Sequence, residues 1–475
     1  MELHISLVGR KDLGSEIYRQ LRQAILAGQL RPGDPLPPSR ELARRLTVSR
    51  STVTGAYDRL AGEGFVTAHV GAGTIVSEHL VRTRGKPKHK RIGDTLRGRR
   101  VWDAIRLPPV LAELPRFDFR SGIPDATLFP HDLWRRLMAR QLRAEAKDMI
   151  AYDAPAGNRG LREAIARHIG VSRGVEASVD DVIVTNGTQQ AMDVVARALL
   201  SPGDHIAVED PGYGPVRSAF TALGLRVRGV PVDGDGLDVE AIPKRARAIY
   251  VTPSHQYPLG VSMTLPRRLA LLAWADRHNA ALIEDDYDSE FRFGGRPIEP
   301  LRMLDKTGRV IYVGSFSKTL LPTLRLGFIV APPSLRDTLH KAKFVADWHT
   351  PTTVQAAAAN FIDNGGFARH IRKMREVYRT RHRMIVDALR RDFATDLNVI
   401  PSTVGLHIAA MARTASTDKI GAIVRRASDA GVVVQELSRF AVNAPGLPGL
   451  VLGYGAIPTA RIEAGLQRLR SCFHR

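Results

Sequence analysis

The chain has 475 residues, of which 44% are hydrophobic and 25% charged, as is usual for a globular protein. No apolar stretch approaches the roughly 18 residues that a membrane span needs, and the N-terminus lacks the apolar core of a signal peptide, so we expect neither a membrane nor a secreted protein. The single cysteine, Cys472, can form no internal disulfide, which favours a reducing cytoplasm, and the formal net charge of +21 is unevenly placed along the chain.

Residues 1–78 predict three helices followed by a β-hairpin. Apolar side chains recur at helical spacing between residues 16 and 26. Ser39 and Ser49 stand where each could cap the next helix, and only a short turn separates these two helices. Residues 65–77 alternate apolar and polar side chains around glycines, which is typical of a two-stranded wing. Two helices joined by a tight turn, the second opening with small polar residues and an arginine, indicate a helix-turn-helix.

This module resembles the winged helix-turn-helix of the GntR family of bacterial transcription regulators, through the runs PGDPLPPSRELA, VSRSTVTGAYDRL and GAGTIV. The resemblance implies that double-stranded DNA is a partner and that it is contacted by Arg40, Ser49, Arg50, Ser51 and Thr52. An arginine can grip guanine O6 and N7 bidentately, and hydroxyls at a helix N-terminus suit phosphate oxygens. The alternative is a helical dimerisation domain whose arginines are only surface charges.

Residues 79–115 are interpreted as a basic linker between two modules. Within them, residues 82–100 carry nine Lys/Arg against one Asp. Such a run is typical of a solvated, disordered linker. Because it follows a DNA-binding module, it could also contact phosphates without reading the base sequence.

From residue 116 to residue 475 the pattern is that of an α/β domain. Short apolar runs alternate with amphipathic helical segments, which predicts a mainly parallel sheet. Ligands of such sheets lie beyond the carboxyl ends of the strands. We therefore expect one convergent site from the polar residues that follow five of the runs: Thr188, Asp210, His255, Asp285 and Lys318.

The most informative run is GSFSKT at residues 314–319, with Arg325 seven residues past Lys318. It follows an apolar strand and carries what a pyridoxal 5′-phosphate (PLP) site needs. A lysine forms a Schiff base with the cofactor's aldehyde, while hydroxyls and a guanidinium hold the phosphate. A lone lysine after a strand could instead extend to the surface, but Ser315, Ser317 and Arg325 beside it favour PLP as the cofactor.

About 350 residues of this module resemble fold-type I PLP enzymes, the aspartate aminotransferase group. The resemblance implies that Lys318 carries the Schiff base, that Asp285 pairs with the pyridine nitrogen, and that Tyr287 donates to the ring's 3-oxygen. The carboxylates around Asp285 could instead suggest a metal site, but no histidine or second acidic motif in the sequence completes one, so we expect no metal. We expect the phosphate to be bound by a strand–helix turn and by the motif around Lys318. Together these supply Gly187, Thr188, Gln189, Ser315, Ser317 and Arg325.

Further site residues come from the same resemblance. Tyr213 matches the residue that stacks on the pyridine ring, and Tyr152 the one that reaches the phosphate of the neighbouring subunit, which implies a dimer. Arg439 occupies roughly the place of an arginine that grips a substrate carboxylate, although it could be an ordinary surface residue. Aminotransferases typically carry Asn-Pro-x-Gly where this chain has SHQYPLG at residues 254–260. Tyr257 therefore replaces an asparagine that contacts the ring oxygen, which argues against efficient transamination.

A GntR-like winged helix (α+β), a basic linker and an α/β aminotransferase-like domain of fold type I, in one chain, resemble the MocR subfamily. The resemblance implies a cytoplasmic, PLP-dependent transcriptional regulator that works as a head-to-tail homodimer. We expect no physiological turnover, with weak transaminase activity left open. Its effector is expected to be an amine or amino acid, or PLP itself. The alternative is an active aminotransferase that carries an accessory DNA-binding domain.

Overall fold

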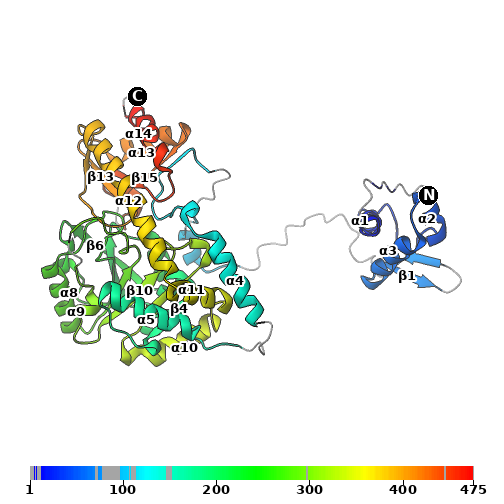
Figure 1. The fold of residues 1–475 in the computed structure, drawn as a ribbon, viewed down its shortest axis with the longest axis horizontal. Helices are drawn as coiled ribbons and strands as arrows, with labels where there is room; N and C mark the ends of the chain where they lie inside the picture. Colours follow the sequence, from blue (N-terminus) through cyan, green and yellow to red (C-terminus); the bar gives the residue numbers. More distant parts are fainter. Residues whose placement is uncertain are drawn as a thin grey trace. The chain divides into compact units, whose positions relative to one another are not determined.

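The computed structural model describes residues 5, 7, 12–69, 73–77, 97–105, 107–108, 114–145, 152–295, 298–442 and 446–473. The chain divides into two compact units, Met1–Gly98 and Arg99–Arg475 (Figure 1). Each unit has a hydrophobic core of its own. Most of the predicted basic linker lies outside the described residues.

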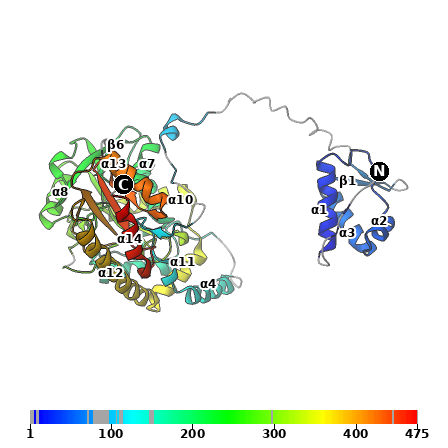
Figure 2. The same ribbon diagram turned by 90° about the horizontal axis from the view of Figure 1, so that it is seen from above.

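The first unit contains the predicted helices and wing: α1 (Leu13–Leu26), α2 (Ser39–Leu46), α3 (Arg50–Gly62), β1 (Val66–His69) and β2 (Gly73–Val76). The two strands are antiparallel, with Val66 opposite Val76. Ser49 caps α3, because its hydroxyl accepts a hydrogen bond of 3.1 Å from the backbone N–H of Thr52. Ser39 was expected to cap α2 but is its first residue. Figure 2 shows α1 and α3 beside the hairpin.

The second unit is built around an eight-stranded sheet with the order β4-β11-β10-β9-β8-β5-β6-β7. The inner strands β10, β9, β8, β5 and β6 are parallel, as predicted, whereas β11, β4 and β7 pair antiparallel with their neighbours. In chain order the strands are β4 (Val182–Thr185), β5 (His205–Asp210), β6 (Arg226–Asp233), β7 (Gly236–Leu237), β8 (Ala246–Val251), β9 (Ala281–Asp286), β10 (Val310–Ser315) and β11 (Gly327–Val330).

Both faces of this sheet are buried. On β5, Ile206 and Val208 join one core cluster, while Ala207 between them joins another. That is why these strands read as continuous apolar runs rather than as alternating ones. The helices of this lobe are α4 (His131–Glu145), α5 (Arg159–Arg173), α6 (Gly187–Leu199), α7 (Gly214–Ala222), α8 (Leu265–Arg277), α9 (Leu301–Leu304), α10 (Arg336–Asp347) and α11 (Thr352–Asp363).

A smaller lobe follows, joined to the large one by the long helix α12 (Gly366–Asp392) (Figure 1). Its sheet has the order β12-β13-β16-β15, and a separate pair joins β14 to β3 near the start of the unit. These elements are β3 (Phe117–Asp118), β12 (Leu397–Val399), β13 (His407–Ala412), α13 (Thr417–Asp429), β14 (Val432–Val433), β15 (Gln435–Glu436), β16 (Gly449–Gly453) and α14 (Ile462–Ser471).

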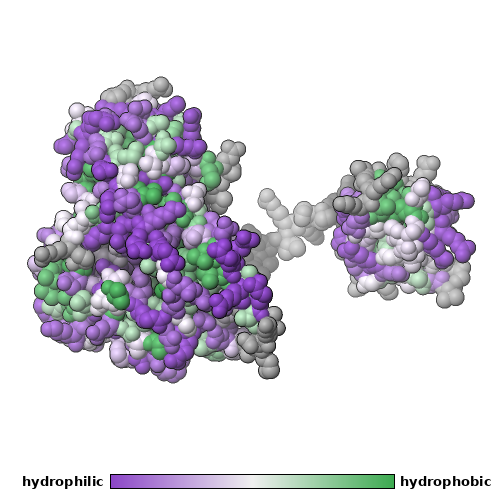
Figure 3. All heavy atoms as spheres, viewed as in Figure 1, coloured by the Kyte–Doolittle hydropathy of each residue, from purple (hydrophilic) through white to green (hydrophobic). Residues whose placement is uncertain are grey.

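Short 3-10 helices complete the second unit: η2 (Arg100–Ala104), η3 (Ala126–Leu128), η4 (Val179–Asp181), η5 (Val239–Ala241), η6 (Pro322–Leu324), η7 (Pro333–Leu335), η8 (Leu437–Phe440) and η9 (Thr459–Arg461). The visible faces of both units are mostly hydrophilic, with hydrophobic areas of limited size (Figure 3). No helix in the described part of the chain has the length and apolar content that a membrane crossing needs.

Candidate functional site

A cavity of about 550 Å³ lies at the carboxyl ends of β8, β9 and β10, where the sheet pattern places a ligand. Residues from these three neighbouring strands and from the small lobe meet there. The predicted cofactor residues that line it are Thr188, Gln189, Tyr213, Tyr257, Asp285, Tyr287, Ser315, Ser317, Lys318 and Arg325. Gly187 borders the same cavity through its contact with Arg325.

Lys318 follows β10 and points its amine into this cavity. Burial lowers the pKa of the amine, while the charges of Asp288 and Asp285 oppose that fall. Gly122, at φ 76°, forms the wall beside the amine, where a Cβ atom would lie only 3.3 Å from Nζ. A lowered pKa favours the neutral amine, which is the form that bonds to a carbonyl carbon.

Asp285, the last residue but one of β9, is a buried carboxylate with one oxygen that has no partner among the described residues. Tyr250 donates a hydrogen bond of 2.8 Å to Oδ2, whereas Oδ1 is buried and has no partner among the described residues. Burial raises the pKa of Asp285 to about 7, against the opposing effect of the Tyr250 hydrogen bond. A buried oxygen of this kind needs a donor, and a protonated pyridine nitrogen is one, so Asp285 fits PLP.

The opposite end of the cavity is built for an anion. Gly187 begins α6, whose first backbone N–H groups have no partner within the helix. At φ 75°, a Cβ atom on Gly187 would lie 3.0 Å from Nη2 of Arg325. Arg325 donates 2.7 Å to the carbonyl of Asn186, which fixes its guanidinium at this helix end. A phosphate fits the helix N-terminus, the guanidinium and the nearby Ser315 hydroxyl.

Two tyrosines line the same cavity. The rings of Tyr213 and Tyr257 meet edge to face, with centroids 5.6 Å apart. The hydroxyl of Tyr257 lies 2.7 Å from that of Ser121, which in turn donates to Gln435. Tyr287 lines the cavity, but its hydroxyl donates 2.9 Å to the backbone carbonyl of His255.

Tyr152 and Arg439 lie away from the cavity within one chain. Tyr152 is 76% exposed and stacks on Trp348, with ring centroids 4.4 Å apart. Arg439 is exposed on η8 and does not line the cavity, although its neighbour Phe440 packs edge-on against Tyr257.

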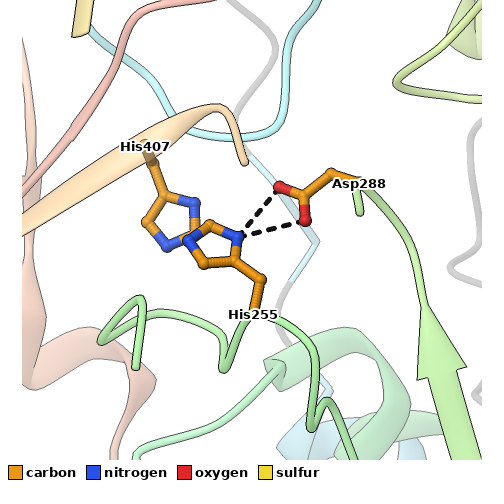
Figure 4. Close-up of side chains that lie close together, drawn as sticks. All are labelled: His255, Asp288 and His407. Atoms are coloured by element: carbon orange, nitrogen blue, oxygen red, sulfur yellow. Dashed lines mark hydrogen bonds and ion pairs between the residues drawn. The ribbon is translucent and has the colours of Figure 1, made fainter. Parts of the chain in front are cut away.

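Sequence reasoning missed several residues of the site. Tyr250 lies within the apolar run that forms β8, and no motif marked it as a site residue. His407 begins β13, about 120 residues after Asp288, and no local motif links the two positions. Asp288 was considered for a metal and set aside for want of a histidine, yet both His255 and His407 lie beside it in space (Figure 4). The missed residues are Ser121, Gly122, Tyr250, Asp288 and His407.

The first unit presents four of the predicted DNA-contacting residues at the start of α3 and the fifth, Arg40, on α2. Arg40, Ser49, Arg50 and Ser51 are exposed, whereas Thr52 is half-buried. The hydroxyl of Ser49 lies 2.7 Å from that of Thr52. Nε of Arg50 lies 3.4 Å from the hydroxyl of Ser39, a weak hydrogen bond that leaves most of the guanidinium open to solvent.

Comparisons with known proteins agree with both domains. Residues 13–76 match the family described as "Bacterial regulatory proteins, gntR family", and residues 124–469 match "Aminotransferase class I and II". The fold is similar to that of the α-aminoadipate aminotransferase LysN of Thermus thermophilus, solved with N-(5′-phosphopyridoxyl)-L-leucine, at a TM-score of 0.68 and 31% identity over 75% of this chain and 91% of that one. The protein thus belongs to a class in which a GntR-type DNA-binding domain is joined to a fold-type I, PLP-binding aminotransferase domain.

Relatives that combine both domains narrow the assignment. The chain is 38% identical to the probable rhizopine catabolism regulatory protein MocR of Rhizobium meliloti, over 96% of this chain and 93% of that protein. It is 33% identical to the pyridoxine biosynthesis transcriptional regulator PdxR of Corynebacterium glutamicum, over 94% and 92% of the two chains. The protein belongs to the MocR-type GntR transcriptional regulators.

Proposed function

We propose that this regulator binds PLP on Lys318 and reports an amine, an amino acid or PLP itself to its DNA-binding unit. One observation carries the proposal: Lys318, the unpaired oxygen of Asp285 and the anion site at Arg325 all face one cavity of about 550 Å³. When bound, PLP supplies an aldehyde carbon that bonds reversibly to primary amines.

Each residue then has a task set by its position. Asp285 holds a proton on the pyridine nitrogen, and Arg325 with the N-terminus of α6 binds the phosphate. Gly187, Thr188, Gln189, Ser315 and Ser317 line that end and orient the group. Tyr213 and Tyr257 would enclose the ring, and Tyr287 would donate to the ring's 3-oxygen.

A second copy of the chain completes this arrangement. Tyr152 is exposed against Trp348, as suits an aromatic side chain that reaches the phosphate in the partner's cavity. We assign Arg439 to an effector carboxylate, since its neighbour Phe440 packs against Tyr257 at the cavity. The dimer is proposed to be head-to-tail, with the protein acting in the cytoplasm.

DNA recognition is assigned to the start of α3. Arg50 reads a base edge, Arg40 adds a second guanidinium, and Ser49, Ser51 and Thr52 contact phosphate oxygens. The cap that Ser49 makes on Thr52 holds the first turn of α3 in shape while its open N–H groups face the backbone of the duplex.

The test is a visible absorbance scan of the purified protein with PLP, followed by a panel of amines and amino acids. A band that one compound shifts would identify an effector, and a band that none shifts would point to sensing of PLP itself. No band with added PLP would contradict the assignment of Lys318. Sustained turnover with a keto acid, at about 1 per second or more, would favour an enzyme over a sensor.

A further inference from the structure

The long helix α12 carries a concentration of positive charge that none of the assignments above uses. Residues 101–475 have 50 Lys/Arg against 39 Asp/Glu, an excess of 11. Residues 366–392, which form α12, account for nine of these Lys/Arg and three of these Asp/Glu, an excess of six. More than half of the excess charge beyond residue 100 therefore lies on one helix of 27 residues.

Four arginines form a stripe along the exposed side of α12, and we call them the arginine stripe. Arg372, Arg379, Arg383 and Arg390 are all exposed and follow one another at intervals of seven, four and seven residues. In a helix of 3.6 residues per turn, these intervals keep the four side chains within about 20° of one direction, over a length of about 27 Å. Figure 1 shows α12 at the front of the second unit, and the same place in Figure 3 is largely hydrophilic.

Most of the arginine stripe has no partner within the protein. Neither a hydrogen bond nor an ion pair with a described residue is made by Arg372, Arg383 or Arg390. The fourth member, Arg379, donates a hydrogen bond of 2.9 Å to Glu376. On the opposite, buried side of the helix, Arg381 is paired with Asp125 at 2.6 Å. The protein thus neutralises the buried guanidinium group and leaves most of the exposed ones open.

The arginine stripe does not serve the stability of the helix. Arg379 and Arg383 stand four residues apart, and like charges at that spacing repel each other on a helix surface. The acidic residues on this side of α12 are Glu376 and Asp387, which the arginines outnumber by two to one. A repulsive row of cations of this kind is relieved when a polyanion lies against it.

The surface beside the arginine stripe can seat a phosphate. A hollow of about 450 Å³ is lined by Arg383 and Arg390 and by Ser402 and Thr403 of the segment after β12, with Asp387 as the acidic residue of its lining. Guanidinium groups and hydroxyls are among the side-chain groups that most often contact the phosphate oxygens of DNA. One strand of B-DNA has a phosphate every 3.4 Å of its axis, so a row of about 27 Å spans about eight of them.

We propose that the arginine stripe of α12 is a second DNA-binding surface, which contacts the phosphate backbone of the duplex that the GntR-type unit holds. The inference goes beyond the proposed function, which assigns DNA recognition to α3, and rests on it for the DNA that the first unit binds. Residues 77–99 join β2 to η2 and can span at most about 80 Å, so they keep that DNA within reach of the second unit. An anionic membrane fits less well, because the apolar face of α12 is buried in the protein core and cannot insert.

The test replaces Arg372, Arg383 and Arg390 together by glutamine in the full chain. The DNAs are the operator alone, the operator with long flanks, and unrelated DNA of the same length. Anisotropy across a range of salt should show about tenfold weaker binding to the flanked operator, with the slope of log affinity against log salt shallower by about 0.9 for each lost phosphate contact. The hydroxyl-radical footprint should lose its protection in the flanks and keep it over the operator.

A matched control removes the same amount of charge from other places on the second unit. Arg245, Arg277 and Lys306 are exposed and, like the stripe, have no hydrogen-bond or ion-pair partner through their side chains among the described residues. Their joint replacement by glutamine should leave the flanked footprint as in the wild type. If the stripe variant matches this control in affinity, salt slope and footprint, the inference is wrong.

Glu376→Gln tests the arginine stripe in the opposite direction and serves should the triple variant not fold. It removes an acidic side chain and frees Arg379, so affinity for the flanked operator should rise, about twofold for the loss of one exposed ion pair. Glu240→Gln, at an exposed glutamate of η5, is the control and should bind as the wild type does. No gain in Glu376→Gln relative to this control would then overturn the proposal.

The footprint over the operator separates this inference from the proposed function. If the wild type leaves the operator unprotected, the assignment of α3 fails, and the salt titration on unrelated DNA still decides whether the stripe binds phosphates. If the operator is protected and the stripe variant behaves as the wild type does, this inference alone fails. Vesicles of phosphatidylglycerol and phosphatidylcholine that bind the wild type more tightly than unrelated DNA does, and lose that binding in the stripe variant, would replace DNA by a membrane surface.

Discussion

At the scale of single residues, Lys318 is a lysine whose pKa is governed by competing effects. Burial favours the neutral amine, and Asp288 and Asp285 favour the ammonium ion. Reversible bonding to a carbonyl carbon requires both forms, one to attack and one to leave. Under the proposed function, the two carboxylates would keep the lysine exchangeable, and Gly122 leaves space beside the amine, where a Cβ atom would lie 3.3 Å from Nζ.

Replacing Lys318 by alanine should abolish the visible band that PLP gains when it is joined to a lysine. Arg325 and Asp285 are unchanged in this variant, so PLP should still bind, more weakly and without the visible band. The measurement is an absorbance titration with PLP, and Lys341→Ala, at an exposed lysine of α10, is the control. A visible band of normal intensity in Lys318→Ala would mean that another amine carries the cofactor.

Asp286, next to the cofactor carboxylate, is a structural residue. Arg173 donates 2.7 Å to its Oδ2, and so does the hydroxyl of Tyr312. Burial alone would raise the pKa of Asp286, but Arg173 and Tyr312 outweigh it, so the pKa is lowered. A carboxylate with a lowered folded-state pKa contributes stability above its unfolded pKa, and this stability disappears as pH falls through the folded value.

Asp286→Asn should therefore destabilise the large unit by about 3–5 kcal/mol, because it leaves the Arg173 charge buried without its partner. Urea unfolding at neutral pH gives the free energy, and the gap to wild type should narrow as the pH approaches the folded pKa of Asp286. Asp337→Asn, in an exposed pair with Lys341, is the control and should cost at most about 1 kcal/mol. Equal destabilisation of the two variants would show that the buried pair contributes no more to stability than the exposed pair.

At the scale of elements, α3 is organised around its first turn. Ser49 caps the helix, and Arg50 follows as an exposed side chain with one weak contact to Ser39. A guanidinium without an ion-pair partner among the described residues can bind a base edge without breaking an internal ion pair. The same turn supplies open backbone N–H groups for a phosphate.

Arg50→Ala should weaken binding to the operator by about 1–3 kcal/mol, the usual cost of removing a bidentate hydrogen bond to a base, and relax specificity at that base. Fluorescence anisotropy on an operator selected from a random pool, with unrelated DNA beside it, measures both effects. Arg22→Ala, in α1 and near Glu63, is a matched control on the same unit. Equal weakening on both DNAs would show that Arg50 binds a phosphate instead of a base.

The elements that could be predicted from sequence are those with a strong local pattern. The strands of the large sheet are buried on both faces, so β8, β9 and β10 appear as short apolar runs, and the site residues follow them directly. The strands of the small lobe were not predicted. His407 and Ser121 reach the cavity only because the folded chain brings distant segments together. No spacing rule links residues so far apart in the chain. Tyr152 and Arg439 were assigned to the site by resemblance alone. Both are exposed, and neither lines the cavity of its own chain.

At the scale of the whole molecule, positive charge is dense in the predicted basic linker. Residues 82–100 carry nine Lys/Arg against one Asp, whereas residues 1–78 carry ten against eight. Charges of this density bind phosphates regardless of base sequence and release counter-ions. Under the proposed function, we expect the DNA-binding unit to supply specificity through Arg50 and the basic segment after it to add affinity that depends on salt.

Replacing Lys86, Lys88, Lys90 and Arg91 together by glutamine should therefore lower affinity for operator and unrelated DNA by a similar factor. The slope of log affinity against log salt should become shallower by about 0.9 for each phosphate that the protein no longer neutralises, because fewer counter-ions are released on binding. The measurement is a salt titration of anisotropy on both DNAs, with PLP absorbance as the control that the large unit is intact. Arg50→Ala should show the opposite pattern, a weakening confined to the operator with nearly the same slope. If the quadruple variant instead kept both affinities and the slope of the wild type, residues 82–100 would be a tether that does not touch DNA.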